Sequence, residues 1–141
     1  MNNALAKQVV DKMMEDDLFS QWLGIEILEV AEGYSKIKMT LREEMINGFG
    51  LIHGGIAFSL ADSAFAFACN NRNNLSVALD TSITFTKATK PSDVLTAEAK
   101  ELHNGRSTGL YLITITNQTG EQVALFKGTC FRTGKPLIST L

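Results

Sequence analysis

The sequence is poor in cysteine, in basic charge and in long apolar runs, and each shortage excludes a class of protein. Its two cysteines, Cys69 and Cys130, form no Cys-x-x-Cys pair and have no neighbouring histidine, so a metal site such as zinc is not expected. Both lie in apolar stretches and are predicted to be buried thiols. The chain has 13 Lys and Arg against 15 Asp and Glu, a formal net charge of −2. This balance disfavours binding to nucleic acid or to a membrane surface.

The chain also lacks the features of a signal peptide and of a membrane span. Its first residues show no basic cluster followed by a long apolar stretch. The longest apolar region, residues 56–69, is interrupted by Ser59, Asp62 and Ser63 and is shorter than the roughly 20 residues that cross a bilayer. With 141 residues, 45% hydrophobic and 20% charged, the sequence predicts a single domain over residues 1–141, located in the cytoplasm.

The pattern along the chain predicts two helices and six strands without a linker or repeat. Apolar residues at helical spacing predict an amphipathic helix over residues 4–19, and a second helix is predicted over residues 55–70. Alternating and β-branched stretches predict strands at residues 25–31, 34–41, 76–87, 94–102, 108–116 and 122–132. Asn-Gly and Thr-Gly pairs between the last three strands indicate hairpins. Hairpins imply antiparallel pairing, so the expected class is α+β.

The second predicted helix is unusual because it is apolar on every side. A surface helix would show a polar face, so this one should be buried on most sides with the sheet curled around it. Asp62 lies in the middle of the helix. Burial without partners is costly for an ionised carboxylate and raises its pKa, which makes Asp62 a candidate base near neutral pH. The alternative is a structural Asp, paired with a buried Ser or Asn or placed at the solvent edge.

A glycine-rich loop precedes this helix and ends in His53-Gly54-Gly55. Backbone N–H groups at a helix start are unpaired and favour negative charge, and glycine lets a ligand approach them closely. Gly54 is therefore a candidate donor to an oxyanion that forms at a reacting carbonyl. Alternatively, the glycines only make the turn into the helix. His53 could act as a general base, although a histidine at this place more often packs or caps the helix.

The spacing of Gly54 and Asp62 predicts an assembly of subunits. Eight residues separate them, which corresponds to about 12 Å along a helix. One reacting carbonyl must lie within hydrogen-bond reach of both the oxyanion donor and the base, so one helix cannot serve both roles. If both roles are real, Gly54 of one subunit works with Asp62 of a second, in two equivalent sites across a two-fold axis.

Three motifs carry a resemblance to a known family: Asn47-Gly48, His53-Gly54-Gly55 and the stretch over residues 59–70. Together they resemble the hotdog-fold acyl-CoA thioesterases, and among these the enzymes of phenylacetic acid degradation. The resemblance extends over nearly the whole chain. It implies a six-stranded antiparallel sheet wrapped around a long central helix, with a short N-terminal helix. It also implies edge-to-edge homodimers that pair into a homotetramer, and hydrolysis of an acyl-CoA without metal or cofactor.

The resemblance also implies roles for individual residues. Asp62 becomes the nucleophile or the base that activates water, and Asn47 orients the water or the reacting group. Gly54 donates its backbone N–H to the thioester carbonyl, with His53 beside it and Gly55 supporting the turn.

One departure concerns the strand after the helix, where human-type members of the family carry a serine that assists water. This chain has Ala78 at that place, and Thr81 or Ser82 could supply the hydroxyl only if the strand register allows. Asp80, in the same strand, is left open between a buried structural carboxylate and a partner of the catalytic group.

Three further residues are candidates for contacts with the substrate. Phe58 and Phe65 could line an acyl pocket, although phenylalanine is a core residue by default. Arg106 could hold the phosphates of CoA, where cations are needed. The acyl group stays open between aryl-acyl groups, such as phenylacetyl or hydroxyphenylacetyl, and medium-chain groups.

Two other functions also stay open. An acyl-thioester hydratase or dehydratase needs a paired acid and base, whereas His53 and Asp62 point about 180° apart on one helix unless two subunits bring them together. A non-catalytic acyl-CoA-binding protein that acts as a sensor normally carries a DNA-binding element. The first helix has no second helix with which to form a helix-turn-helix.

Overall fold

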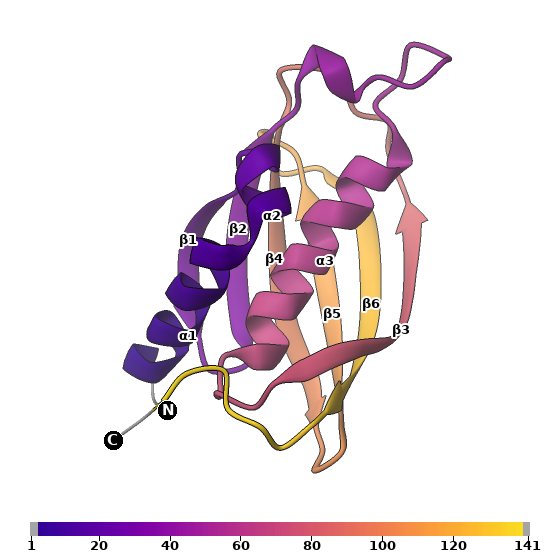
Figure 1. Ribbon diagram of the computed structural model, residues 1–141. Helices are drawn as coiled ribbons and strands as arrows, with labels where there is room; N and C mark the ends of the chain where they lie inside the picture. The colour runs from indigo at the N-terminus through magenta and orange to yellow at the C-terminus, as the bar shows by residue number, and fades with distance from the viewer. Residues whose placement is uncertain (1–2, 140–141) are drawn as a thin grey trace.

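A long central helix, lying against a strongly curved sheet, organises the fold in the computed structural model, which describes residues 3–139 (Figure 1). The helices are α1 (Asn3–Asp16), α2 (Leu18–Leu23) and α3 (Gly54–Asn70), with a 3-10 turn η1 (Glu43–Met45). The strands are β1 (Glu26–Ala31), β2 (Tyr34–Thr40), β3 (Ser76–Phe85), β4 (Val94–Asn104), β5 (Thr108–Thr116) and β6 (Gln122–Arg132). They form one antiparallel sheet in the order β1-β2-β4-β5-β6-β3.

The core lies between α3 and the concave face of the sheet. Every second residue of β2, of β5 and of the first half of β4 is buried, because side chains alternate across a strand and one set points to α3. α1 lies along β1 and contacts α3 from the side. Most of α3 is therefore buried. One stripe remains open, made by Gly55, Ser59, Asp62 and Ala66 at helical spacing.

These elements confirm the predicted α+β class, the six-stranded antiparallel sheet and the buried central helix. The observed bounds of the strands and of α3 agree with the predicted ones to within two residues. Both cysteines are free and buried, as predicted. Within residues 3–139, no helix is both long and apolar enough to cross a membrane.

The predicted first helix over residues 4–19 is wrong at its C-terminal end, because the chain breaks at Asp17. The Asp17 carboxylate caps a new helix, α2: its Oδ1 accepts a hydrogen bond from the Ser20 backbone N–H at 2.9 Å, and its Oδ2 accepts one from Ser20 Oγ at 2.6 Å. Gly24, with φ of 80°, ends α2 in the left-handed region. From α2, the Ser20 hydroxyl contacts the Ser63 hydroxyl of α3 at 2.8 Å.

Strand β3 forms one edge of the sheet and is exposed on both faces for most of its length. Val77, Leu79 and Phe85 are 51%, 62% and 53% exposed. Within the described chain β3 pairs only with β6, so its other edge presents free backbone groups. Asp80 is exposed as well, so it is not a buried carboxylate within the single chain.

The candidates for the assisting hydroxyl lie on the same strand. Ala78 is exposed opposite Cys130, and a bulge follows it before Asp80. Thr81 is half-buried opposite Gly128, whereas Ser82 is exposed. The bulge shifts the register between Ala78 and these two hydroxyls, so they do not follow a simple two-residue alternation from Ala78.

The contact between Gly128 and Phe65 yields a stability prediction. A Cβ added to Gly128 would lie 2.8–2.9 Å from atoms of the Phe65 ring, which is buried in the core. We expect Gly128→Ala to lower the free energy of unfolding by about 1–3 kcal/mol, measured by urea denaturation, because the ring has no room to move. Gly48→Ala is the control, since no atom lies within 4 Å of its added Cβ. Equal stability of the two variants would contradict this account.

Candidate active site

The start of α3 leaves one backbone donor unused. His53 is the N-cap, and its Nδ1 accepts a hydrogen bond from the Gly55 N–H at 2.9 Å. Nδ1 acts as an acceptor here, so a neutral ring carries its proton on Nε2. The Gly54 N–H, by contrast, has no acceptor within residues 3–139. His53 thus caps the helix, the alternative considered from the sequence, and Gly54 is the donor left free for a ligand.

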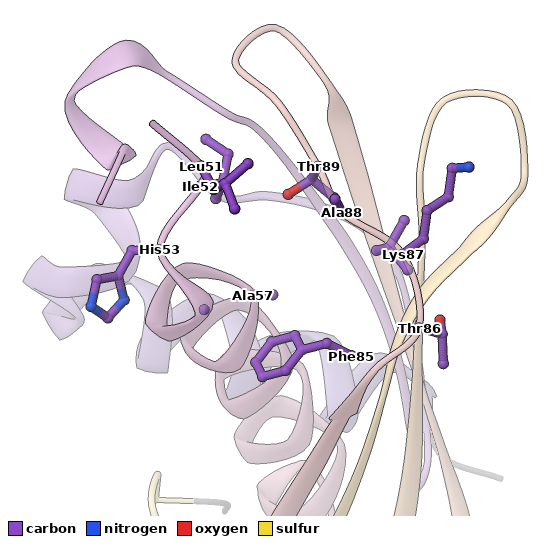
Figure 2. A pocket seen from close by; sticks show the side chains of 11 residues that line it. Leu51, Ile52, His53, Ala57, Phe85, Thr86, Lys87, Ala88 and Thr89 are labelled. Atoms are coloured by element: carbon purple, nitrogen blue, oxygen red, sulfur yellow. The ribbon is translucent and has the colours of Figure 1, made fainter. Parts of the chain in front are cut away.

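A cavity of about 390 Å³, the Gly54 cavity, opens beside this donor (Figure 2). Its wall is mainly apolar and includes Leu51, Ile52, Ala57, Phe85, Ala88 and Val123. The Phe85 ring lies against the first turn of α3, and a Cβ added to Gly54 would lie 3.1 Å from its Cζ. Figure 2 shows the His53 ring directed away from Phe85. A cavity of this size and character suits a small apolar group with one polar contact.

Asp62 lies in a second, smaller cavity of about 200 Å³, the Asp62 cavity, on the open stripe of α3. Burial raises the pKa of this carboxyl group, and the nearby negative charge of Asp17 raises the pKa further. No donor within the described chain makes a hydrogen bond to the Asp62 carboxylate, although three serines line its cavity. An unpaired carboxylate with a raised pKa can act as a base or nucleophile.

The two cavities are separate within one chain, as the spacing of their residues along α3 predicts. Gly54 lines only the first and Asp62 only the second. A single chain therefore does not bring the oxyanion donor and the base to one carbonyl.

Asn47 stabilises the loop before α3. Its Oδ1 accepts hydrogen bonds from the backbone N–H groups of Phe49, at 2.9 Å, and Leu51, at 3.2 Å. This arrangement fixes the glycine-rich loop. The Asn47 Nδ2 has no acceptor within residues 3–139, so it is free to donate to a ligand or a water. Asn47 lines neither the Gly54 cavity nor the Asp62 cavity.

The structure separates the two phenylalanine candidates. Phe58 lines the Asp62 cavity and makes an edge contact with Phe126, with ring centroids 5.3 Å apart. Phe65 is only 2% exposed and packs against Tyr111 and Phe126 in the core. Neither the Gly54 cavity nor the Asp62 cavity reaches Phe65, so its placement is that of a core residue.

Arg106 lies in a third cavity of about 340 Å³ at the C-terminal end of α3, with Arg72 and Arg132. The last two are already used: Arg72 pairs with Glu101, and the buried Arg132 donates to the Cys69 carbonyl at 3.0 Å. Arg106 is exposed and has no ion pair within the described residues. The cavity lies at the opposite end of α3 from Gly54, about 24 Å away along a 17-residue helix.

No group of three or more His, Cys, Asp or Glu side chains within residues 3–139 is arranged to hold a metal ion. The chemistry that these residues offer by themselves is that of a base or nucleophile with a backbone oxyanion donor.

Comparison with known proteins assigns this arrangement to a family. Residues 49–124, which contain both Gly54 and Asp62, match the model of the thioesterase superfamily. The chain belongs to the thioesterase superfamily. The Escherichia coli acyl-coenzyme A thioesterase PaaI is 43% identical over 92% of both chains. These matches confirm the resemblance to hotdog thioesterases and the prediction of an enzyme of the thioesterase class.

Solved structures of this superfamily confirm the hotdog fold. The structure of E. coli PaaI, from the phenylacetic acid degradation operon, superposes with a TM-score of 0.94, covering 96% of this chain and 99% of PaaI at 40% identity. A hypothetical thioesterase from Streptococcus pneumoniae, solved with coenzyme A, superposes with a TM-score of 0.76 at 32% identity. That comparison covers 79% of this chain and 88% of the other.

Sequence reasoning missed three residues that the structure brings to the candidate site. Asp17 and Ser20 line the Asp62 cavity, and Phe85 covers Gly54. A local signal existed for Asp17, since Asp is one of the preferred helix N-cap residues. No local signal indicated Phe85, because its contact depends on how β3 passes the start of α3.

Proposed function

We propose that the chain hydrolyses acyl-CoA thioesters to a free acid and CoA, with Asp62 as the base or nucleophile. The observation that carries this proposal is the unpaired Asp62 carboxylate, whose pKa is raised, on the open stripe of a helix that begins with an unpaired Gly54 N–H. The name of E. coli PaaI and the CoA in the S. pneumoniae structure support an acyl-CoA substrate.

The proposed site is made by two subunits. The open stripe of α3 and the exposed edge strand β3 lie on a surface where a second copy can pack, edge strand to edge strand. A two-fold axis that passes α3 near Phe58, midway between Gly54 and Asp62, would place Gly54 of one copy against Asp62 of the other, and would do so twice. The homodimer is therefore the unit that the chemistry requires, and pairing into a homotetramer is proposed from the resemblance alone.

In this site the thioester carbonyl oxygen accepts a hydrogen bond from Gly54, which stabilises the negative charge that develops on it. Asp62 removes a proton from water as the water oxygen bonds to the carbonyl carbon, and the free Asn47 Nδ2 can orient that water. The carbon–sulfur bond then breaks, and the CoA thiolate takes up the proton. Alternatively, Asp62 attacks the carbon directly and water hydrolyses the resulting anhydride. Both routes release one acid and one thiol.

The Gly54 cavity is proposed to hold the acyl group. Its apolar wall and the Phe85 ring suit an aryl-acetyl or a medium-chain acyl group. Phe58 would border the reacting carbonyl from the side of Asp62. Arg106 is retained as the candidate for the CoA phosphates, because it is the exposed arginine of its cavity without an ion pair.

Thiol release from a panel of acyl-CoA esters tests the proposal. The panel contains phenylacetyl-, hydroxyphenylacetyl-, benzoyl- and hexanoyl-CoA, and a thiol reagent reports free CoA. We expect turnover of at least one ester, with a ranking that identifies the acyl group. Binding of these esters without thiol release would contradict hydrolysis and would favour a hydratase or an acyl-CoA-binding protein instead.

A further inference from the structure

The junction between α1 and α2 places a second carboxylate at the Asp62 cavity. Asp17 lines this cavity, and its position is fixed because both of its oxygens accept hydrogen bonds from Ser20. Ser20 is fully buried and its Oγ lies 2.8 Å from Ser63 Oγ, which comes directly after Asp62 in α3. Asp17 is thus tied to the helix that carries Asp62 through two buried hydroxyls.

The serine hydroxyls that line the Asp62 cavity donate their protons to acceptors other than Asp62. Ser20 donates its single hydroxyl proton to Asp17 Oδ2, so the contact between Ser20 and Ser63 requires Ser63 to donate to Ser20. Ser59 donates to the Gly55 carbonyl at 2.7 Å. None of the three serines that line the cavity therefore donates to Asp62. A carboxylate that receives no hydrogen bond keeps its basicity, because such bonds stabilise the charged form.

We propose that Asp17 is a positioning residue for hydrolysis, which fixes a negative charge at the Asp62 cavity and draws the hydroxyls of Ser20 and Ser63 away from the Asp62 carboxylate. This inference rests on the proposed function of Asp62 as base or nucleophile. No Lys, Arg or His lines the Asp62 cavity within the described chain. The Asp62 charge also acts on the buried Cys69 thiol of α3, whose pKa lies far above its usual value, so Cys69 stays neutral and adds no charge. Asp17 is thus the charged neighbour that faces Asp62.

The sign of the effect follows from the charges. Burial is the larger cause of the raised pKa of Asp62, and repulsion by ionised Asp17 adds to it. Without the Asp17 charge the ionised form of Asp62 is less disfavoured, so its pKa falls. Asp62 is inactive when protonated, so kcat/KM falls as the pH drops below the pKa of Asp62. Without the Asp17 charge, this fall should occur at lower pH.

Asp17→Asn tests the proposal, with Asp16→Asn as the matched control. Asparagine retains an acceptor for the Ser20 N–H and is itself a good N-cap, so α2 should persist. The Asp16 side chain is 70% exposed and pairs with Lys12. Asp16→Asn therefore removes the same charge as Asp17→Asn, at the residue next to Asp17 and outside the Asp62 cavity. The measurements are the pH profile of kcat/KM on the preferred acyl-CoA and an NMR titration of the Asp62 side-chain carboxyl carbon. We expect both to shift to lower pH in Asp17→Asn and to stay unchanged in Asp16→Asn.

The possible outcomes separate the alternatives. An unshifted titration in Asp17→Asn, or equal shifts in both variants, would overturn the proposal. A loss of rate that is uniform across pH would also overturn it, since this is the mark of a structural cap alone. If the wild type released no thiol from any acyl-CoA, the proposed function would fail. The NMR titration would still report independently whether Asp17 acts on Asp62.

Discussion

Asp62→Asn should lower kcat/KM for acyl-CoA hydrolysis by about 10²–10⁴-fold, the range in which a positioned general base contributes to catalysis. Asparagine has nearly the same shape as aspartate but can neither take a proton from water nor attack as a nucleophile. The Asp62 carboxylate receives no hydrogen bond within the described chain, so the substitution removes no structural bond. The loss should therefore be confined to chemistry, and steady-state thiol release across the acyl-CoA panel measures it.

Folding and charge controls make this result interpretable. The thermal midpoint of Asp62→Asn should equal or exceed that of the wild type, because a partly buried, unpaired charge is replaced by a neutral group. Asp16→Asn, which removes an exposed carboxylate on α1, should retain wild-type activity. A rate for Asp62→Asn within a few-fold of the wild type would remove Asp62 from the mechanism and leave the activity to another residue.

The strands and the central helix could be predicted because their signals are local and repeated. β5 alternates buried and half-buried side chains over its 9 residues, and β6 alternates buried with more exposed ones from Ala124 onward. The turns that precede these two strands carry the glycines expected between hairpin strands. The apolar surface of α3 correctly predicted its burial. Its one open stripe could not be located from the sequence, because alanine occurs on all sides of the helix and only tertiary packing decides which side is covered.

The break at Asp17 was missed because two local signals conflicted. Apolar spacing continues across this residue into Leu18 and Phe19, which favours one long helix. In the structure Asp17 ends this run and serves as the N-cap of α2, because both of its carboxylate oxygens accept hydrogen bonds from Ser20. The approach of this junction to Asp62 could not be predicted, since it depends on a contact between hydroxyls 43 residues apart.

The positions of the phenylalanines also depend on contacts between distant segments, which the sequence does not reveal. From composition, each is a core residue by default, and sequence spacing alone does not distinguish them. In the structure Phe49 is 89% exposed at the tip of the glycine-rich loop, Phe58 lines the Asp62 cavity and Phe65 is fully enclosed. Phe65 is enclosed because Gly128 on β6 has no side chain to displace its ring, a pairing between distant segments.

Gly54→Pro should lower kcat for thiol release by about 10²–10³-fold, the typical effect of losing one oxyanion donor. Proline lacks the N–H and fits the first position of a helix, and His53 already has the extended ψ of 131° that a residue before proline prefers. Gly54→Ala is the matched control. Both variants add a Cβ that crowds Phe85, but alanine keeps the donor, so its loss should be markedly smaller. Equal losses would assign Gly54 a packing role only.

Mixing two inactive variants tests whether the site is shared between subunits. In a heterodimer of Gly54→Pro and Asp62→Asn chains, one shared site carries both defects and the other carries neither. If subunits exchange at random, half of the dimers are mixed and each has one intact site, so about a quarter of wild-type activity should return. A site within one chain would recover nothing, because every chain carries a defect. Recovery therefore depends on Gly54 and Asp62 acting across the two-fold axis, as their separation along α3 requires.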